Sequence, residues 1–307
     1  MISEYFNPGY RAEGRPQHAR GKAGGKIARL IAAMAGIGLL SGPVLADPND
    51  HVLTMDNGQT LVTDLEPKAD HPLDHLYSGW RFRERETQAL QLDDFENPAF
   101  PAVDAGEELW SKVDGSEGKS CASCHNDAAV SMKGVRAQMP KWNAAINRPH
   151  TLETQINECR TTRMGAEKWK WEARQMLAMT AYIGLQSRGM AVSVNVDEGE
   201  MPKWSEKGKA LYYTRVGQLN MSCANCHEDN YGNMIRADHL SQGHINGFPT
   251  YRLKWAGLGS THRRFKGCMD NIRATPFKRG SDEFTALEVY LAARGNGLSV
   301  ETPAVRN

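Results

Sequence analysis

Two short segments with the order Cys-x-x-Cys-His constrain this chain more than any other feature. They consist of Cys121, Cys124 and His125, and of Cys223, Cys226 and His227. Two thiols at this spacing reach the two vinyl groups of one haem, and the imidazole that follows reaches its iron. A redox dithiol or half of a zinc site is the alternative for a single Cys-x-x-Cys, but the following histidine and the repetition weaken both. The motifs therefore predict two covalently bound haem c groups.

The N-terminal residues predict export. Residues 1–29 carry six arginine and lysine side chains, and an apolar run of 17 residues follows at 30–46. Because this run contains glycine and proline and closes on Val44-Leu45-Ala46, it predicts a signal peptide over residues 1–46. An uncleaved membrane anchor is the alternative. Attachment of haem c takes place on the outer face of the membrane, so both features predict a periplasmic protein with no membrane segment after cleavage.

The charge of the mature chain excludes one class of partner. The leader holds six of the 37 basic and two of the 36 acidic side chains, so its removal leaves a net charge of −3. A nearly neutral chain of this kind gives no reason to expect a nucleic-acid partner.

The two motifs lie in the same sequence frame. Gly106 and Gly208 each stand 15 residues before the first cysteine of a motif, and each half ends in an amphipathic helical pattern, at residues 172–189 and 282–295. A helix before the haem motif and another at the end of the unit form the cytochrome c pattern, in which the two helices cross. The predicted fold is therefore mainly α, with two tandem cytochrome c-like domains from an internal duplication and an N-terminal extension.

The domain boundaries follow from this repeat. The predicted parts are a signal peptide at 1–46, an N-terminal extension at 47–100, a first domain at 101–190, a linker at 191–203 and a second, catalytic domain at 204–307. The linker is acidic, contains glycine and proline and lacks helical periodicity. We expect the extension to form a helix and an extended arm, and nothing in it indicates a chemistry.

Two cysteines remain outside the motifs, one in each half. Cys159 and Cys268 both lie between a haem motif and the terminal helix, where a cytochrome c supplies the sixth iron ligand. A disulfide between them suits an oxidising compartment, but equivalent positions in duplicated domains are expected to lie too far apart. Axial thiolate ligation explains one cysteine in each unit and is favoured. The third interpretation is free buried thiols, with the ligand taken from Met164, Met269, His150 or His262.

The surroundings of the two cysteines differ. Arg264 stands four residues before Cys268, whereas Gln155 stands four residues before Cys159, and residues 261–280 hold six basic side chains against one acidic. Positive charge favours an anionic partner or substrate and lowers the pKa of a nearby thiol. Cys268 is therefore the better candidate for nucleophilic chemistry. The alternative is a solvated basic surface that docks an acidic protein.

With these features the chain resembles a known family. The leader, the duplicated haem unit, the extra cysteine in each unit and, above all, the segment RRFKGCMDNIRATPF (263–277) are similar to the di-haem form of the SoxA family of SoxAX cytochromes. The resemblance runs from about residue 70 to the end of the chain. It implies an L-cysteine S-thiosulfotransferase of sulfur oxidation that joins thiosulfate to a cysteine of the SoxYZ carrier protein. It also implies a heterodimer with the mono-haem cytochrome SoxX and a soluble cytochrome c as electron acceptor.

The resemblance assigns roles to individual residues. Cys121, Cys124 and His125 would hold the first haem with Cys159 as distal ligand, and Cys223, Cys226 and His227 the second with Cys268 as distal ligand. In the family the sulfur at the position of Cys268 is catalytic and can carry a persulfide, and the arginine at the position of Arg264 binds the substrate anion.

Two other functions compete with this one. A di-haem electron-transfer cytochrome without sulfur chemistry would use Cys159 and Cys268 only as ligands and the basic residues to dock a redox partner. A di-haem peroxidase needs an open haem face, which two cysteine ligands oppose.

Overall fold

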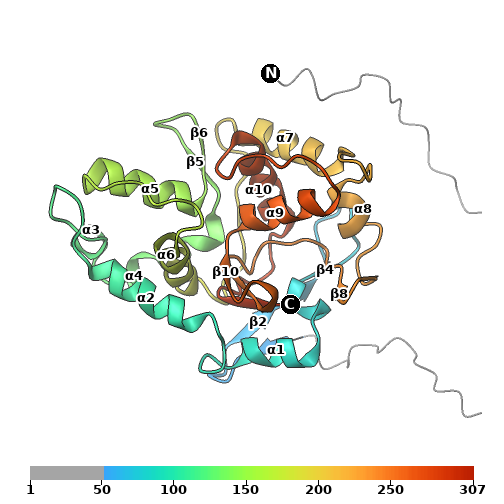
Figure 1. Cartoon of the computed structure of the whole chain (residues 1–307), viewed down its shortest axis with the longest axis horizontal. Coiled ribbons are helices and arrows are strands. Elements are labelled where there is room, and N and C mark those ends of the chain that lie inside the picture. Colours follow the sequence, from blue (N-terminus) through green and yellow to red (C-terminus); the bar gives the residue numbers. More distant parts are fainter. Residues whose placement is uncertain (1–51) are drawn as a thin grey trace, which may run out of the picture. The chain divides into compact units, whose positions relative to one another are not determined.

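A computed structural model describes residues 52–307, so the predicted signal peptide lies outside the described residues. This part of the chain is mainly helical (Figure 1). The α-helices are α1 Arg85–Leu92, α2 Phe100–Ser111, α3 Ala122–His125, α4 Ala128–Ser131, α5 Leu152–Arg163, α6 Arg174–Leu185, α7 Met201–Tyr213, α8 Cys223–His227, α9 Thr261–Asn271 and α10 Asp282–Arg294. Short 3-10 helices lie at η1 Gly79–Phe82, η2 Arg136–Gln138 and η3 Leu253–Trp255.

Two pairs of helices cross at glycines. Helix α2 packs along α6, and α7 packs along α10 (Figure 1). A Cβ atom added to Gly106 would lie 2.3 Å from the carbonyl oxygen of Ala178, and one added to Gly208 would lie 2.0 Å from that of Ala286. Only a residue without a side chain allows backbones to approach so closely. The helices expected before each motif and at the end of each half are therefore present, and each pair crosses as predicted.

Local sequence signals explain where these helices begin. Proline stands in the first turn of α2 and of α7, where the missing N–H costs nothing. The hydroxyl groups of Thr151, Ser260 and Ser281 cap the first turns of α5, α9 and α10. Apolar clusters then form around the two crossings, with Trp110 and Met176 in one and Tyr212 and Phe284 in the other.

The strands are short and connect the helices. The two-stranded pairs are β1 Val52–Thr54 with β2 Thr60–Val62, β3 Asp64–Leu65 with β4 Leu76–Tyr77, β5 Lys141–Asn143 with β6 Arg148–His150, and β7 Met234–Ile235 with β8 Asp238–His239. The one three-stranded sheet among residues 52–307 has the order β10 Gly257–Gly259, β9 Thr250–Arg252, β11 Ala304–Arg306. Strand β11 runs parallel to β9, so the C-terminal residues lie beside the segment that leads into α9.

The N-terminal extension is held by the C-terminal segment. Glu301 is 1% exposed. Its carboxylate accepts hydrogen bonds from Ser78 and Gln91 and forms an ion pair with Arg306. The expected helix is α1, and the expected extended arm is two short strand pairs. A buried carboxylate with this many donors fixes the extension on the rest of the fold.

The segment predicted as a linker is built into the fold. Residues 191–200 contain no helix, as expected, but Val192 and Val194 are buried. Backbone hydrogen bonds pair Val192 with Leu298 and Gly297, and α7 already begins at Met201. Its assignment as a boundary between two domains stays a prediction.

Candidate functional site

The second Cys-x-x-Cys-His motif forms a capped helical turn, α8. The Ser222 side chain accepts from the amide of Asn225, and the Asn225 side chain accepts from the amide of Ser222. This capping box fixes the start of the turn at Cys223. Cys226 follows three residues later on the same face of the helix, and His227 ends the turn.

One nitrogen of His227 is already engaged. Its Nδ1 atom donates to the carbonyl oxygen of Ser241 at 2.6 Å, which leaves Nε2 as the nitrogen available to a metal. Gly243 packs against the ring, because a Cβ atom there would lie 2.9 Å from the imidazole. The backbone from 241 to 243 therefore fixes the orientation of the ring.

Cys268 faces this imidazole from α9. The thiol is partly buried and is a hydrogen-bonding partner of His227. Burial raises the pKa of the Cys268 thiol. The Arg264 charge, the His227 hydrogen bond and the Arg252 charge together lower it by more, so the pKa falls to about 6. The geometry thus brings an imidazole and a thiolate-prone sulfur into contact, and these are the two side chains that would bind the iron of a haem held at this motif.

Arg264 is the unpaired guanidinium beside this sulfur. Its charge acts on both Cys268 and Cys226, yet no ion pair or side-chain hydrogen bond joins it to any residue from 52 to 307. Its neighbours are engaged: Arg263 lies over the Trp255 ring at 4.2 Å, and Arg252 pairs with Asp238. Arg264 is therefore free to bind an anion.

The basic stretch at 261–280 is less open than its composition indicates. Lys266 pairs with Asp270 at 2.7 Å, and Arg279 lies 3.6 Å from Glu172. With Arg263 on Trp255, these contacts neutralise or cover much of the local excess of charge. Arg264, Arg273 and Lys278 are the basic side chains of this stretch without an ion pair or ring contact among the described residues, and Arg264 is the one whose charge acts on Cys268.

The first motif has the same frame with different chemistry. It lies in α3, and the charge of Cys159 on α5 acts on Cys121, so these two sulfurs are neighbours. The Gln155 amide donates to the Cys159 sulfur at 3.6 Å, at the position that Arg264 occupies in the second site. His125 is exposed and lies beside Trp110, with ring centroids 5.8 Å apart. In the first site the group beside the cysteine is an uncharged amide, and the histidine is more exposed than in the second site.

The structure bears directly on the disulfide interpretation of the two extra cysteines. All six cysteines lie within the described residues and are free thiols, so no disulfide joins Cys159 to Cys268 in this structure. The other candidate ligands also have different surroundings. Met164 caps α5, Met269 packs on the apolar core, His150 lies between Asn143 and Gln155, and His262 stacks on Trp171.

The residues at the second motif fit a covalent haem. Two thiols stand one helical turn apart, an imidazole presents Nε2 with its other nitrogen bonded to a carbonyl group, and a fourth sulfur-bearing side chain faces it. This donor set matches thioether attachment with histidine and cysteine as axial ligands. The first motif offers the same four groups, with weaker orientation of its histidine.

Sequence reasoning missed two contributors to the site. Arg252 lies in β9, 16 residues before Cys268, and its charge reaches the thiol only because the sheet brings β9 beside α9. Ser241 acts through its backbone carbonyl, which any residue type carries. Neither position has a signal in the sequence.

Among residues 52–307, no helix combines the length and apolar character needed to cross a lipid bilayer.

Comparison with protein families matches residues 105–192 to the SoxA/TsdA cytochrome c domain, a domain that implies bound haem c. Curated relatives include the SoxA subunits of L-cysteine S-thiosulfotransferase from two organisms. The subunit of Pseudaminobacter salicylatoxidans is 52% identical over 276 residues, which cover 90% of this chain and 96% of the relative. That of Paracoccus pantotrophus is 51% identical over 281 residues, with the same shares covered.

A solved structure is similar along most of the chain. A chain in the crystal structure of SoxXA from P. pantotrophus superposes with a TM-score of 0.79 at 52% sequence identity. The match covers 83% of this chain and 97% of that one.

Proposed function

The chain belongs to the SoxA family of L-cysteine S-thiosulfotransferase subunits, and we propose that Cys268 is its catalytic sulfur and Arg264 its anion-binding residue. The enzyme acts in thiosulfate oxidation, and its product is a thiosulfate group joined to a cysteine of a SoxYZ carrier protein. The observation that carries the residue assignment is the unpaired guanidinium of Arg264 beside a thiol whose pKa is lowered to about 6.

Two haem-binding units, related by a tandem duplication, underlie the activity. Both halves have a glycine-mediated helix crossing, a Cys-x-x-Cys-His turn and a capped helix with a cysteine eight residues after its cap. This shared frame supports two covalent haems, the first held at residues 121–125 with Cys159 and the second at 223–227 with Cys268. The cofactor accepts electrons one at a time when bound.

The substrate chemistry follows from the charges at Cys268. Thiosulfate carries sulfonate oxygens, which suit charge-assisted hydrogen bonds from the guanidinium of Arg264. The charge of Arg252, which pairs with Asp238, also acts on Cys268. The anion so held presents its outer sulfur to the sulfur of Cys268.

The coupling step is a two-electron oxidation. One S–S bond forms between the Cys268 sulfur and the outer sulfur of thiosulfate, and two electrons leave. A partner cytochrome, SoxX, and a soluble cytochrome c accept them in turn. The thiosulfate group then passes to the carrier cysteine, and the Cys268 thiolate is restored. Secretion by the predicted leader places this chemistry in the periplasm.

A peptide mass experiment tests the assignment. The haem-loaded protein is exposed to thiosulfate, digested without reductant, and the peptide that carries Cys268 is weighed. A gain of sulfur or of a thiosulfate group on Cys268 is the expected result. An unmodified Cys268 together with unimpaired electron transfer would favour the electron-carrier function instead.

A pair of variants tests Arg264. Arg264→Gln places in the second site the amide that stands over Cys159 in the first, and it should lower thiosulfate turnover strongly while both haems stay bound. Arg263→Gln removes the same charge from the neighbouring residue, whose side chain lies on Trp255, and should leave turnover near that of the wild type. Equal losses in the two variants would mean that Arg264 acts only through general charge.

A further inference from the structure

The two helices that carry Cys159 and Cys268 start at one small buried cavity. Thr151 caps α5 and Ser260 caps α9, and each cysteine lies eight residues after its cap. The cavity has a volume of about 10 Å³, close to the least that holds one water molecule. Its polar lining comes from Arg136, Glu153, Thr180, Thr261 and Glu288. Two carboxyl groups, one from α5 and one from α10, therefore line the same cavity inside the protein.

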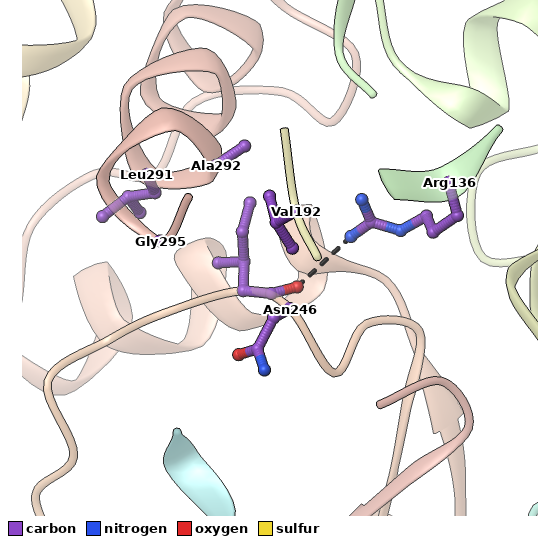
Figure 2. A pocket seen from close by; sticks show the side chains of 7 residues that line it. Arg136, Val192, Asn246, Leu291, Ala292 and Gly295 are labelled. Carbon is purple, nitrogen blue, oxygen red and sulfur yellow. Dashed lines mark hydrogen bonds between the residues drawn. The ribbon is translucent and has the colours of Figure 1, made fainter. Parts of the chain in front are cut away.

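The guanidinium of Arg136 does not neutralise both carboxylates. Its nitrogens donate to the carbonyl oxygens of Phe248 at 3.1 Å, Ile245 at 3.2 Å and Met139 at 3.4 Å. Figure 2, which draws another pocket that Arg136 lines, shows this side chain reaching toward the segment that holds Asn246, where the bond to Ile245 forms. Arg136 thus supplies one positive charge to the cavity but makes no hydrogen bond to a carboxylate among the described residues.

His262 supplies no positive charge either. Its Nδ1 atom accepts from the amide of Gly280 at 2.9 Å, so the ring proton is on Nε2 and the imidazole is neutral. The Nε2 atom lies 3.0 Å from Oε2 of Glu288, out of line for a hydrogen bond, and neither atom has another partner. The ring is stacked on Trp171 at 4.7 Å and cannot turn away.

The charges do not balance if both carboxyl groups are ionised. Glu153 is 8% exposed and Glu288 4% exposed, so two buried negative charges would face the single positive charge of Arg136. Burial raises the pKa of Glu153 to about 7, and the neighbouring Glu288 charge contributes. The His262 ring, the amide at the start of α5 and the Thr151 hydroxyl act in the opposite direction and lower this pKa by less. The rest of the cavity lining is uncharged, so no further group completes the balance.

The cavity lies at similar distances along both ligand helices. Of the residues that line it, Glu153 stands six residues before Cys159 and Thr261 seven residues before Cys268, or about 9 and 10 Å along the helix axes. We propose that Glu153 and Glu288 form a buried proton-binding site that holds one shared proton at neutral pH and binds it more tightly when a haem held by α5 or α9 is reduced. The redox part of this proposal rests on the proposed haem sites. When such a haem takes up an electron, the site takes up a proton from water in those molecules where it is still deprotonated, and this proton compensates the added negative charge.

Infrared spectroscopy of the haem-loaded protein tests the shared proton without any turnover. The wild type should show a carbonyl band of a protonated carboxyl group at neutral pH, and the band should be lost in Glu153→Gln and in Glu288→Gln. Glu283→Gln, in the first turn of α10 where Glu283 is partly exposed and lies 3.8 Å from Lys207, is the matched control and should keep the band. The absence of such a band in the wild type would overturn the proposal, whatever the variants do.

Redox titration over a pH series tests the coupling. The midpoint potential of at least one haem should fall as the pH rises through neutrality, and the dependence should flatten in Glu153→Gln but persist in Glu283→Gln. An unchanged pH dependence in Glu153→Gln would overturn the coupling. Failure of thiosulfate chemistry at Cys268 would leave both readouts intact, so the two proposals fail separately.

Discussion

Replacing Gly208 with alanine should test whether the crossing of α7 and α10 holds the second unit together. The added Cβ atom would lie 2.0 Å from the carbonyl oxygen of Ala286 and 2.7 Å from Cβ of Tyr290. Ordinary contact begins at 3.4 Å, so the two helices must separate by about 1.4 Å at this point. Because the obstructing atom belongs to the backbone of α10, no side-chain rotation relieves the overlap.

The expected cost is the difference of two effects. Alanine favours a helix interior over glycine by about 0.5–1 kcal/mol. Forcing a packed core apart costs about 1–3 kcal/mol, and a backbone obstruction lies at the upper end of that range. We therefore expect Gly208→Ala to lower the free energy of unfolding by about 1–2 kcal/mol.

Urea unfolding of the haem-loaded protein, followed by circular dichroism, measures this change. Gly267→Ala is the control, because Gly267 is also inside a helix but a Cβ there meets nothing within 4 Å. The control should gain about 0.5–1 kcal/mol. Gly106→Ala, whose Cβ would lie 2.3 Å from a backbone oxygen, should lose stability as Gly208→Ala does. The reasoning is refuted if Gly208→Ala is as stable as the wild type.

Three further changes probe other parts of the fold. The pKa of Glu153 is raised from 4.5 to about 7, so its contribution to stability is complete below pH 4.5 and is lost as the pH rises through 7. Urea unfolding across this pH range should show that the free energy of unfolding falls by about 3 kcal/mol. This pH dependence should be absent in Glu153→Gln. Gly243→Ala combines a φ of +78° with a Cβ 2.9 Å from the His227 ring, and it should perturb the electron paramagnetic resonance signal of the second haem. Glu301→Gln should cost about 1–3 kcal/mol and speed proteolysis of residues 52–100.

The parts of the fold that sequence predicted depend on local patterns. Gly106 and Gly208, the two Cys-x-x-Cys-His turns and the terminal helices follow from spacing, because a helix crossing and a capped turn are determined by residues close in the sequence. The placement of Cys159 and Cys268 beside the motifs also follows from the shared frame of the two halves.

The parts that sequence could not predict depend on contacts between distant segments. Two of the donors to Glu301, Ser78 and Gln91, lie more than 200 positions away, and no pattern near Glu301 indicates this. Arg252 reaches Cys268 only through the pairing of β9 with its neighbours. Glu153 and Glu288 look like ordinary surface carboxylates on amphipathic helices, and only the packing of α5 against the second half buries them. Burial of charge is a property of the tertiary structure.

Helices α5 and α9 each carry a cysteine at the same position, but the side chain beside that cysteine differs. In α5 the group over the sulfur is the neutral amide of Gln155, and the facing motif leaves His125 exposed. In α9 the corresponding group is the unpaired guanidinium of Arg264, and a carbonyl hydrogen bond orients His227. An amide has no net charge with which to hold an oxyanion, whereas a guanidinium has both charge and directed donors. Thiosulfate chemistry is therefore expected at Cys268 alone, and Gln155→Arg should add anion binding at the first site.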